Sequence, residues 1–336
     1  MVRNSCGTRR GRGFTLVELL VVITIIAMLM GLTVAGVMQA KIAAQRTQCL
    51  NNSMHLAKAV NNFAVQKQRL PYSVELHPGT GVAGVPALAS GWVPPLLPFI
   101  EGNELHRIYS TNTANPLPLP PDLNAAGPLT PSYIMQLPLL VCPSNFNVLQ
   151  PAGLSYAVNA GRRDNSNPLA GQPFDAQANG VFFSRYRAAG PSSSTPLVTT
   201  DLAYISSHDG TTSTILFAEN LNATVWQSPT GYQGEGTQEI VWQATAPPLA
   251  LNRGADQALD PATLNTARPS SNHPGGFHVA FCDASVKFLS EDIDYRVYCR
   301  LMTPHGAAAV EPGTTTPTVG IAPWVGLPVS EQDLER

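Results

Sequence analysis

An apolar stretch near the N-terminus limits what this chain can fold into more than any other feature. Residues 14–38 read FTLVELLVVITIIAMLMGLTVAGVM, and Glu18 is the only charged side chain among these 25 residues. A helix rises 1.5 Å per residue, so the stretch covers about 37 Å and can cross the roughly 30 Å hydrocarbon layer of a membrane with some tilt. It is longer than the apolar part of a cleaved secretory signal, and soluble cores rarely need a helix so free of charge. We therefore expect a transmembrane helix over residues 14–38.

The charges on either side of this stretch set its expected orientation. Four arginines and no acid lie in residues 1–13, whereas only Lys41 and Arg46 closely follow the stretch. By the positive-inside rule, the N-terminus should lie in the cytoplasm and the rest of the chain outside it. The whole chain has a net charge of −2 and 12% charged residues, so no basic face for nucleic acid is expected.

The beginning of the apolar stretch carries a specific motif. Residues 13–23 read GFTLVELLVVI, which resembles the cleavage and methylation motif of type IV prepilins. The resemblance implies that a prepilin peptidase removes the leader, residues 1–13, after Gly13, and that the new N-terminus, Phe14, is N-methylated. It also implies that Glu18, the fifth residue of the mature chain, meets the α-amino group of a neighbouring subunit. Electrostatics agrees, because a carboxylate in lipid is costly unless it is paired and an α-amino group is positive at neutral pH.

The helical pattern continues beyond the membrane stretch. No Pro or Gly occurs from Gln39 to Gln68, Pro71 is placed to end the helix, and apolar side chains recur at helical spacing: Ile42, Cys49, Leu56, Val60 and Phe63. We expect an amphipathic continuation over residues 39–70 that packs on a soluble domain. One helix of about 55 residues would resemble a pilin subunit. The alternative is two helices separated by a kink near Gly31 or Gly36.

Beyond Pro71 the pattern changes to short apolar segments separated by Pro, Gly and Asn. Residues 104–109 indicate a short helix, and strands are favoured at 136–142, 154–159, 180–186, 214–219 and 239–243. Residues 116–131, 187–200, 244–272 and 303–323 are typical of loops. We expect a loop-rich, largely antiparallel α+β domain over residues 71–300 and a loop-rich tail at 301–336. With the long N-terminal helix, this fold class is pilin-like.

Residues 277–289 predict a β-hairpin near the end of this domain. Apolar and polar side chains alternate in 277–282 and 285–289, and Asp283-Ala284 joins them as a two-residue turn that favours positive φ. This turn would pair Phe281 with Val286. One face would then hold five apolar side chains: Phe277, Val279, Phe281, Val286 and Phe288. From the likeness to pseudopilins, we expect that face to pack on the helix around Val60.

Scattered segments of the exported domain resemble one bacterial prepilin-like family, whose exported domain has no assigned biochemical function. They follow one another along the chain at residues 48–52, 91–92, 97–101, 142–144, 155–159, 179–182, 209–216 and 273–276. The family's C-terminal signature is His-x9-Asp-Gly, matched here by His273 and Asp283, with Ala284 in place of the glycine. Asn145 stands where the family often has an acid, which weakens a metal site drawn through that turn.

Cysteine usage fits an exported domain. Cys6 is lost with the leader, which leaves Cys49, Cys142, Cys282 and Cys299, an even number in a compartment that permits disulfides. Four cysteines allow three pairings. Cys49 and Cys142 lie in segments that resemble the family, so the resemblance favours a bond between these two and leaves the other two to pair. Free buried thiols are the alternative.

No segment carries a catalytic signature such as G-x-S-x-G, H-E-x-x-H or a phosphate loop. His208-Asp209-Gly210 is typical of a turn before a strand rather than of a metal phosphohydrolase. Two metal sites are conceivable and not favoured: a zinc set of His273, His278, Cys282 and Asp283, and a calcium set of Asp201, Asp209 and Glu219. We therefore expect a protein that is not an enzyme and needs no metal or cofactor.

Together these patterns favour a membrane-anchored, prepilin-like structural protein of the pseudopilin type, a minor subunit of a type II secretion or type IV pilus-like assembly. The resemblance implies a single-pass protein of a bacterial inner membrane with its C-terminal domain in the periplasm or otherwise outside the cytoplasm. Its implied partners are the prepilin peptidase and N-methyltransferase, other prepilin-like subunits met through the N-terminal helix, the assembly machinery and the lipid bilayer. The alternative is a membrane-tethered ligand-binding module that uses the prepilin route only for insertion, and a tethered hydrolase is a third candidate.

Overall fold

The computed structural model describes residues 15–77, 88–111, 136–145, 153–162, 175–184, 197–223, 226, 238–242, 251, 268–311, 314–318, 327, 329 and 333. The chain divides into two compact units, Met1–Ala44 and Gln45–Arg336. The boundary falls inside the first helix, which therefore contributes its first part to one unit and its second part to the other.

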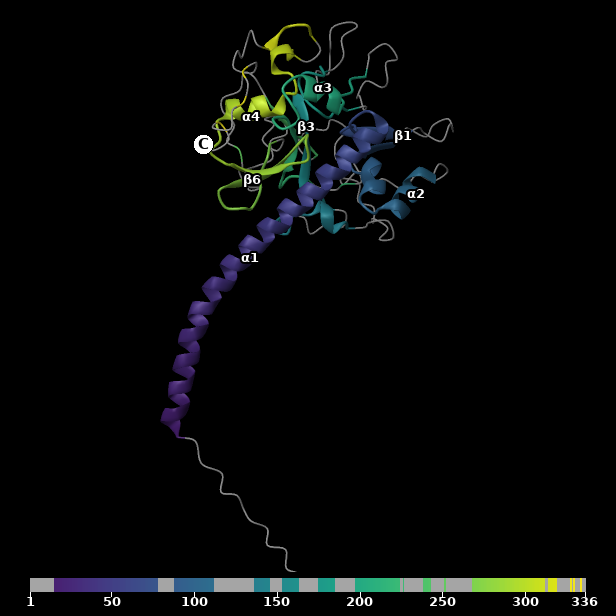
Figure 1. The fold of residues 1–336 in the computed structure, drawn as a ribbon. Coiled ribbons are helices and arrows are strands. Elements are labelled where there is room, and N and C mark those ends of the chain that lie inside the picture. Colours follow the sequence, from purple (N-terminus) through teal and green to yellow (C-terminus); the bar gives the residue numbers. More distant parts are fainter. Residues whose placement is uncertain are drawn as a thin grey trace, which may run out of the picture. The chain divides into compact units, whose positions relative to one another are not determined.

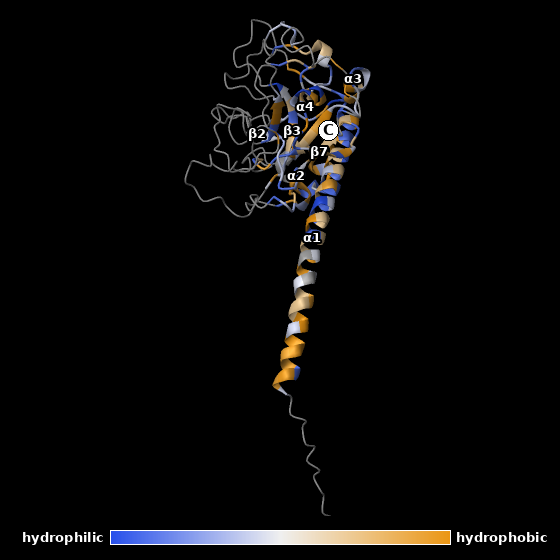
Figure 2. Cartoon of the chain, turned by 90° about the vertical axis from the view of Figure 1, so that its left-hand side faces the viewer, coloured by the Kyte–Doolittle hydropathy of each residue, from blue (hydrophilic) through white to orange (hydrophobic). Residues whose placement is uncertain are grey.

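Helix α1 spans Leu16–Lys67, so the structure has the single long N-terminal helix that the sequence predicts. In the first unit, the large apolar side chains that the structure describes between Leu16 and Met38 are exposed. Figure 2 shows the hydrophobic colour running along this part of α1 and a mixed colouring along the second part. The helix ends where Gln68 takes a left-handed conformation with φ 54°, which is a common way to end a helix.

A five-stranded sheet forms the centre of the second unit. Its strand order is β5-β3-β4-β6-β7, with β3 at Tyr156–Arg162, β4 at Ile215–Glu219, β5 at Glu239–Trp242, β6 at Gly276–Phe281 and β7 at Val286–Ser290. Neighbouring strands pair antiparallel except β3 and β5, which are parallel. A separate antiparallel pair joins β1 (Val74–His77) to β2 (Leu88–Gly91). The predicted α+β fold is confirmed.

Helices α1 and α4 (Tyr295–Met302) pack on opposite faces of this sheet (Figure 1). On one face, Leu56, Val60 and Phe63 of α1 lie in a buried cluster with Trp92 and Phe217. On the other face, α4 shares a second buried cluster with side chains of β5 and β6. The sheet is therefore the middle of three layers, and the strand position of a residue decides which helix it faces. The other helices are short: η1 (Pro94–Phe99), α2 (Asn103–Thr111), η3 (Pro138–Leu140), α3 (Leu202–Ser207) and η5 (Gly306–Ala308).

Two expected strands do not form within the described residues. Residues 136–142 contain the 3₁₀ turn η3 instead of a strand, because Pro138 has no N–H to give to a sheet ladder. Residues 180–184 form no regular strand: beside one isolated β-bridge from Ser184 to Val74, the N–H groups of Val181 and Phe182 donate to the Asn159 carbonyl. Conversely, α3 and α4 are not indicated by the apolar pattern. Each begins at an aspartate whose carboxylate accepts a backbone N–H in the first turn, Asp201 and Asp294, and such caps start short helices.

The C-terminal hairpin forms, but the expected two-residue turn is wrong. The backbone N–H of Phe281 bonds to the carbonyl of Ser285 at 2.9 Å, so the loop holds three residues, 282–284. Ala284 takes φ 67°, as the last residue of such a loop does. β6 consequently pairs Ala280 with Val286 and Val279 with Lys287. This is one residue away from the expected register, and a one-residue slip moves every side chain of β7 to the other face.

The change of register corrects which side chains meet α1. Phe277, Val279 and Phe281 lie in the cluster beneath α4. Ala280 and Cys282 lie in the cluster that contains Val60 of α1, and Val286 packs against it. The expected face of five apolar residues on α1 is therefore wrong, because the three-residue loop places the two strands' aromatic residues on opposite sides.

Replacing Ala284 with glycine should raise the thermal midpoint slightly. A side chain in the left-handed region costs roughly 1–2 kcal/mol, whereas glycine adds unfolded-state entropy worth about 0.4–1 kcal/mol. We expect a net gain of at most about 1.6 kcal/mol, read from tryptophan fluorescence during thermal unfolding of the full chain in detergent. Ser285→Gly, at a neighbouring residue without positive φ, is the control and should lower the midpoint. A lower midpoint for Ala284→Gly would contradict the left-handed geometry.

Candidate functional site

The first turn of α1 holds the residues that the prepilin motif singles out. Gly13 and Phe14 lie outside the described residues. Glu18 lies three residues after Thr15, and its Oε2 accepts the Thr15 backbone N–H at 2.9 Å and the Thr15 hydroxyl at 2.8 Å. In return, the Glu18 N–H donates to the Thr15 hydroxyl at 3.3 Å. This reciprocal pattern is a capping box, which satisfies N–H groups that the start of a helix leaves without partners.

A second group of polar side chains is buried where α1 meets the sheet. Cys49 of α1 and Cys142, which follows η3, form a disulfide with a Cα–Cα distance of 5.1 Å. Two amides of α1 hold the same loop: Gln45 Nε2 donates to the Pro143 carbonyl at 3.2 Å and Asn52 Nδ2 to the Val141 carbonyl at 3.2 Å. The pair favoured by the resemblance is therefore the one that the structure joins.

The second expected pair does not form. Cys282 and Cys299 are buried and not joined by a disulfide, because Cys282 belongs to the cluster beneath α1 and Cys299 to the cluster beneath α4. The sheet lies between them. Burial raises the pKa of the Cys282 thiol, with a smaller contribution from Asp283, so this thiol stays protonated and is unreactive.

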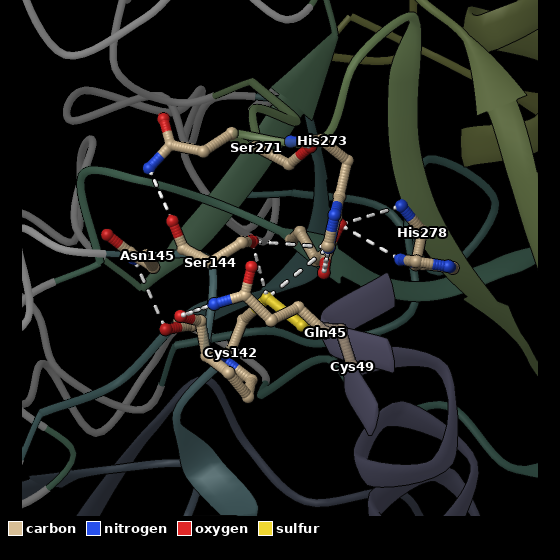
Figure 3. A network of polar contacts seen from close by, with 12 residues as sticks. Gln45, Cys49, Cys142, Ser144, Asn145, Ser271, His273 and His278 are labelled. Carbon is tan, nitrogen blue, oxygen red and sulfur yellow. Dashed lines mark hydrogen bonds and ion pairs between the residues drawn. A yellow bond between two sulfur atoms is a disulfide. The ribbon is translucent and has the colours of Figure 1, made fainter. Parts of the chain in front are cut away.

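His273 lies beside the disulfide and faces three polar groups (Figure 3). Its Nε2 is 3.4 Å from Cys142 Sγ, 3.3 Å from the Ser144 hydroxyl and 3.3 Å from Glu219 Oε1. The loop before β6 carries His273, whose backbone N–H bonds to the Ser271 hydroxyl at 3.1 Å. Glu219 is the last residue of β4 and its side chain is 2% exposed.

The other oxygen of Glu219 is held by β6. Oε2 accepts the backbone N–H of His278 at 2.8 Å and lies 3.2 Å from His278 Nδ1. Burial alone would raise the pKa of the Glu219 carboxyl, but the hydrogen bonds and charges of His273 and His278 outweigh burial and hold that pKa below its ordinary value. The carboxylate is thus ionised, fixed by β6 on one side and turned toward His273 on the other.

The residues named as metal ligands from the sequence do not gather in the expected sets. Asp283 lies in the hairpin turn, where it accepts the Ser285 N–H at 2.8 Å, and Cys282 faces α1, so neither joins His273. In the calcium set, Asp201 caps α3, and Asp209 accepts the Gly306 N–H at 2.7 Å. Glu219 is occupied by the two histidines. His208-Asp209-Gly210 forms the expected turn before β4.

A different set of ligand atoms does come together. One atom each from Cys49, Cys142, Glu219 and His273 lie within 4.8 Å of one another, and all four residues are buried. A small hollow, lined in part by Ser144 and Ser271, reaches Cys142 and Glu219. Sequence reasoning named these four residues but in separate roles, and it did not link His278 to Glu219. One sequence signal could have indicated this link: Glu219 ends an apolar strand, and a carboxylate that is buried there requires a partner.

Two family models match this chain, one over most of its length and one at its N-terminal motif. A family model described as a protein of unknown function (DUF1559) matches residues 38–296, most of the chain. A model described as the prokaryotic N-terminal methylation motif matches residues 8–34. No match is found among curated proteins or among solved structures.

Replacing Glu219 with glutamine should lower the thermal midpoint at neutral pH and flatten its dependence on acid. The folded-state pKa of Glu219 lies below its unfolded value of about 4.3, so its contribution is present above that pH and is lost as pH falls through the folded-state pKa. Breaking a buried ion pair costs about 3–5 kcal/mol. We therefore expect a large difference from wild type near pH 7 that shrinks below about pH 4, measured by fluorescence-detected melting of the full chain.

Glu104→Gln is the matched control for this measurement. Glu104 also has a lowered pKa, because Arg107 donates to it, but the pair is exposed. Its removal should change the midpoint little at any pH. An equal difference between Glu219→Gln and wild type across the whole pH range would contradict an ionised, paired Glu219.

Proposed function

The chain belongs to the DUF1559 family of proteins of unknown function, and we propose that it serves as a minor, pseudopilin-type subunit of a type II secretion or type IV pilus-like assembly. It carries a prokaryotic N-terminal methylation motif, so it is a precursor of the type IV pilin-like kind. The motif implies processing by a prepilin peptidase and assembly with pilin-like machinery. Membership of a prepilin-like structural family points to a protein that is not an enzyme.

The exposed apolar part of α1 is the observation that carries the proposal. Among the described residues, α1 is long and apolar enough to cross a membrane, and its most apolar window is not buried in the protein. The helix also satisfies its own polar groups: the hydroxyls of Thr24 and Thr33 donate to carbonyls one turn earlier, at 2.8 and 3.1 Å, as lipid requires. We infer a single membrane crossing with the arginine-rich leader in the cytoplasm.

The geometry of Glu18 supports subunit pairing at the start of this helix. Thr15 contacts only one carboxylate oxygen, Oε2, through both of its bonds. In the proposed assembly, Oε1 of Glu18 meets the methylated amine of Phe14 from a neighbouring subunit. The capping box holds the carboxylate at the helix start, and the amine neutralises a charge that would otherwise be costly in lipid. This pair fixes the stagger between neighbouring helices.

The size and independent core of the second unit favour a minor subunit over a bulk filament subunit. Two buried clusters, one on each face of the sheet, consist of residues from Leu56 onward. The domain is thus built to fold outside the membrane on its own core. We propose that it lies in the periplasm or otherwise outside the cytoplasm, and that it is presented by the anchored helix rather than repeated as the bulk of a fibre.

Cleavage between Gly13 and Phe14 is the first expected outcome. When the full precursor is expressed with a prepilin peptidase, N-terminal sequencing and mass spectrometry of the membrane-extracted protein should give a chain that begins at N-methylated Phe14. The variant Gly13→Val, which alters the motif at the cleaved bond, should keep its leader. A wild-type chain that begins at Met1 or near Lys41 would contradict the proposed processing.

Loss of the Glu18 carboxylate should weaken subunit association without preventing insertion. Glu18→Val removes a charge from the membrane helix, so the protein should still be extracted only by detergent. Photocrosslinking between subunits from the exposed Ile26 position should fall strongly. Glu104→Gln, which alters an exposed carboxylate on α2, should leave crosslinking unchanged. Crosslinking that is equal in wild type and Glu18→Val would favour the alternative, a tethered ligand-binding module that uses the prepilin route only for insertion.

A further inference from the structure

The buried residues around the disulfide have the composition of a metal site. Two sulfurs, one imidazole nitrogen and one carboxylate oxygen lie within 4.8 Å of one another. Thiolate, imidazole and carboxylate are the ligands that proteins offer to Zn²⁺, usually four in a tetrahedron. Here the four donors come from α1, from the loop after η3, from the end of β4 and from the loop before β6, so they meet only in the folded chain.

We propose that, whenever Cys49 and Cys142 carry free thiols, their sulfurs bind one Zn²⁺ together with His273 Nε2 and Glu219 Oε1. The disulfide and the metal are then two alternative ways to close the same junction between α1 and the sheet. The proposal does not depend on subunit assembly.

Two of the donor separations already fit a tetrahedral zinc site. With Zn–S near 2.3 Å and Zn–N and Zn–O near 2.0–2.1 Å, neighbouring ligand atoms in a tetrahedron lie about 3.3–3.8 Å apart. The structure has 3.4 Å between Cys142 Sγ and His273 Nε2 and 3.3 Å between His273 Nε2 and Glu219 Oε1. The two sulfurs are closer than this, because they are bonded to each other. Once that bond is absent, they can separate to the tetrahedral spacing by side-chain rotation.

The groups around the donors orient them as the surroundings of metal sites do. His278 holds Glu219 through its backbone N–H and its Nδ1, both at Oε2, and this leaves Oε1 turned toward His273. The Ser144 hydroxyl lies 3.0 Å from Cys142 Sγ and is able to donate to a thiolate there. Hydrogen bonds of this kind fix ligand orientation and tune metal affinity.

Zinc binding and disulfide formation use the same two sulfurs; the first releases protons, and the second moves electrons and protons. When Zn²⁺ binds, the two thiols release two protons and bind as thiolates, while Glu219 is already ionised. When the disulfide forms, an oxidant of the disulfide class takes two electrons from the two thiolates and two protons from the solvent and is itself reduced to a dithiol. The S–S bond then replaces the two Zn–S bonds as Zn²⁺ leaves. A newly exported chain carries free thiols before this oxidation, so it passes through the state that binds zinc.

The test measures metal binding by the full chain in detergent in both redox states. A Cys6→Ser background removes the leader thiol. Reduction by a water-soluble phosphine cleaves the disulfide, the phosphine taking an oxygen atom from water to become its oxide while two thiols form. The phosphine is then removed without air. We expect one Zn²⁺ per reduced chain and none per oxidised chain. Co²⁺ in place of Zn²⁺ should give the sulfur-to-cobalt charge-transfer absorption and strong visible bands of a tetrahedral thiolate site.

Variants separate a metal site from a set of accessible thiols. Cys49→Ser, Cys142→Ser and His273→Gln should abolish the cobalt thiolate spectrum or weaken binding severely. Ser144→Ala and His278→Gln alter the surroundings only, and should weaken binding by roughly 10–100-fold. Cys282→Ala and His208→Gln, outside the site, should leave the affinity unchanged. Full retention of zinc by Cys49→Ser or His273→Gln would overturn the proposal.

The folded state of the reduced chain is followed in the same samples. Buried tryptophans, including Trp92 and Trp226, report folding through their fluorescence. If reduction unfolds the chain and Zn²⁺ restores the native signal, the proposal is supported, because binding is then coupled to folding. A reduced chain that stays folded and binds no Zn²⁺, or an unfolded one that Zn²⁺ does not restore, would overturn it.

Discussion

The packing of the second part of α1 on one face of the sheet is the contact on which the rest of the domain depends. Leu56, Val60 and Phe63 are almost completely removed from solvent, and each such side chain contributes about 1.5–3 kcal/mol when buried. Polar groups at the edges set the register of the helix: Asn61 Nδ2 donates to the Cys282 carbonyl at 3.0 Å, and Arg46 lies 3.6 Å above the Phe288 ring. The hairpin β6–β7 is therefore positioned by the same helix whose first part is exposed and apolar.

The junction of helix and sheet is closed by more than apolar packing. The disulfide Cys49–Cys142 joins residues 93 apart in the sequence, and a loop of that length stabilises a fold by about 4–5 kcal/mol in the chain-entropy model. Beside it, Glu219 is a buried charge that the fold tolerates only because His273 and His278 pair with it. A zinc ion bound by the reduced cysteines would use the same residues to hold the same elements together.

Local sequence patterns determined the features that need no distant partner. The apolar run between Leu16 and Met38, whose only charged residue is Glu18, and the absence of Pro or Gly after it specify α1, since helical spacing and length are local properties. Thr15 and Glu18 are spaced as a capping box, which is also local. The strands β3, β4 and β5 followed from apolar runs bounded by turn residues. The bond between Cys49 and Cys142 was favoured only through a resemblance, because spacing alone leaves three pairings open.

The tertiary structure decided those features that depend on which faces of the strands and helices pack together. The hairpin register depends on whether Ala284 is the second or the third residue of its loop. Backbone hydrogen bonds from the loop to the carbonyls of Thr211 and Thr214 stabilise the three-residue loop, and the alternation of apolar and polar residues carries no information about them. Cys282 and Cys299 stay apart because the sheet separates them. Glu219 lies more than fifty residues before His273 and His278 in the sequence, and only the antiparallel pairing of β4 with β6 brings the three side chains together. The sequence by itself determined the anchor helix and the fold class, because both follow from local periodicity, whereas the buried site exists only through long-range strand pairing.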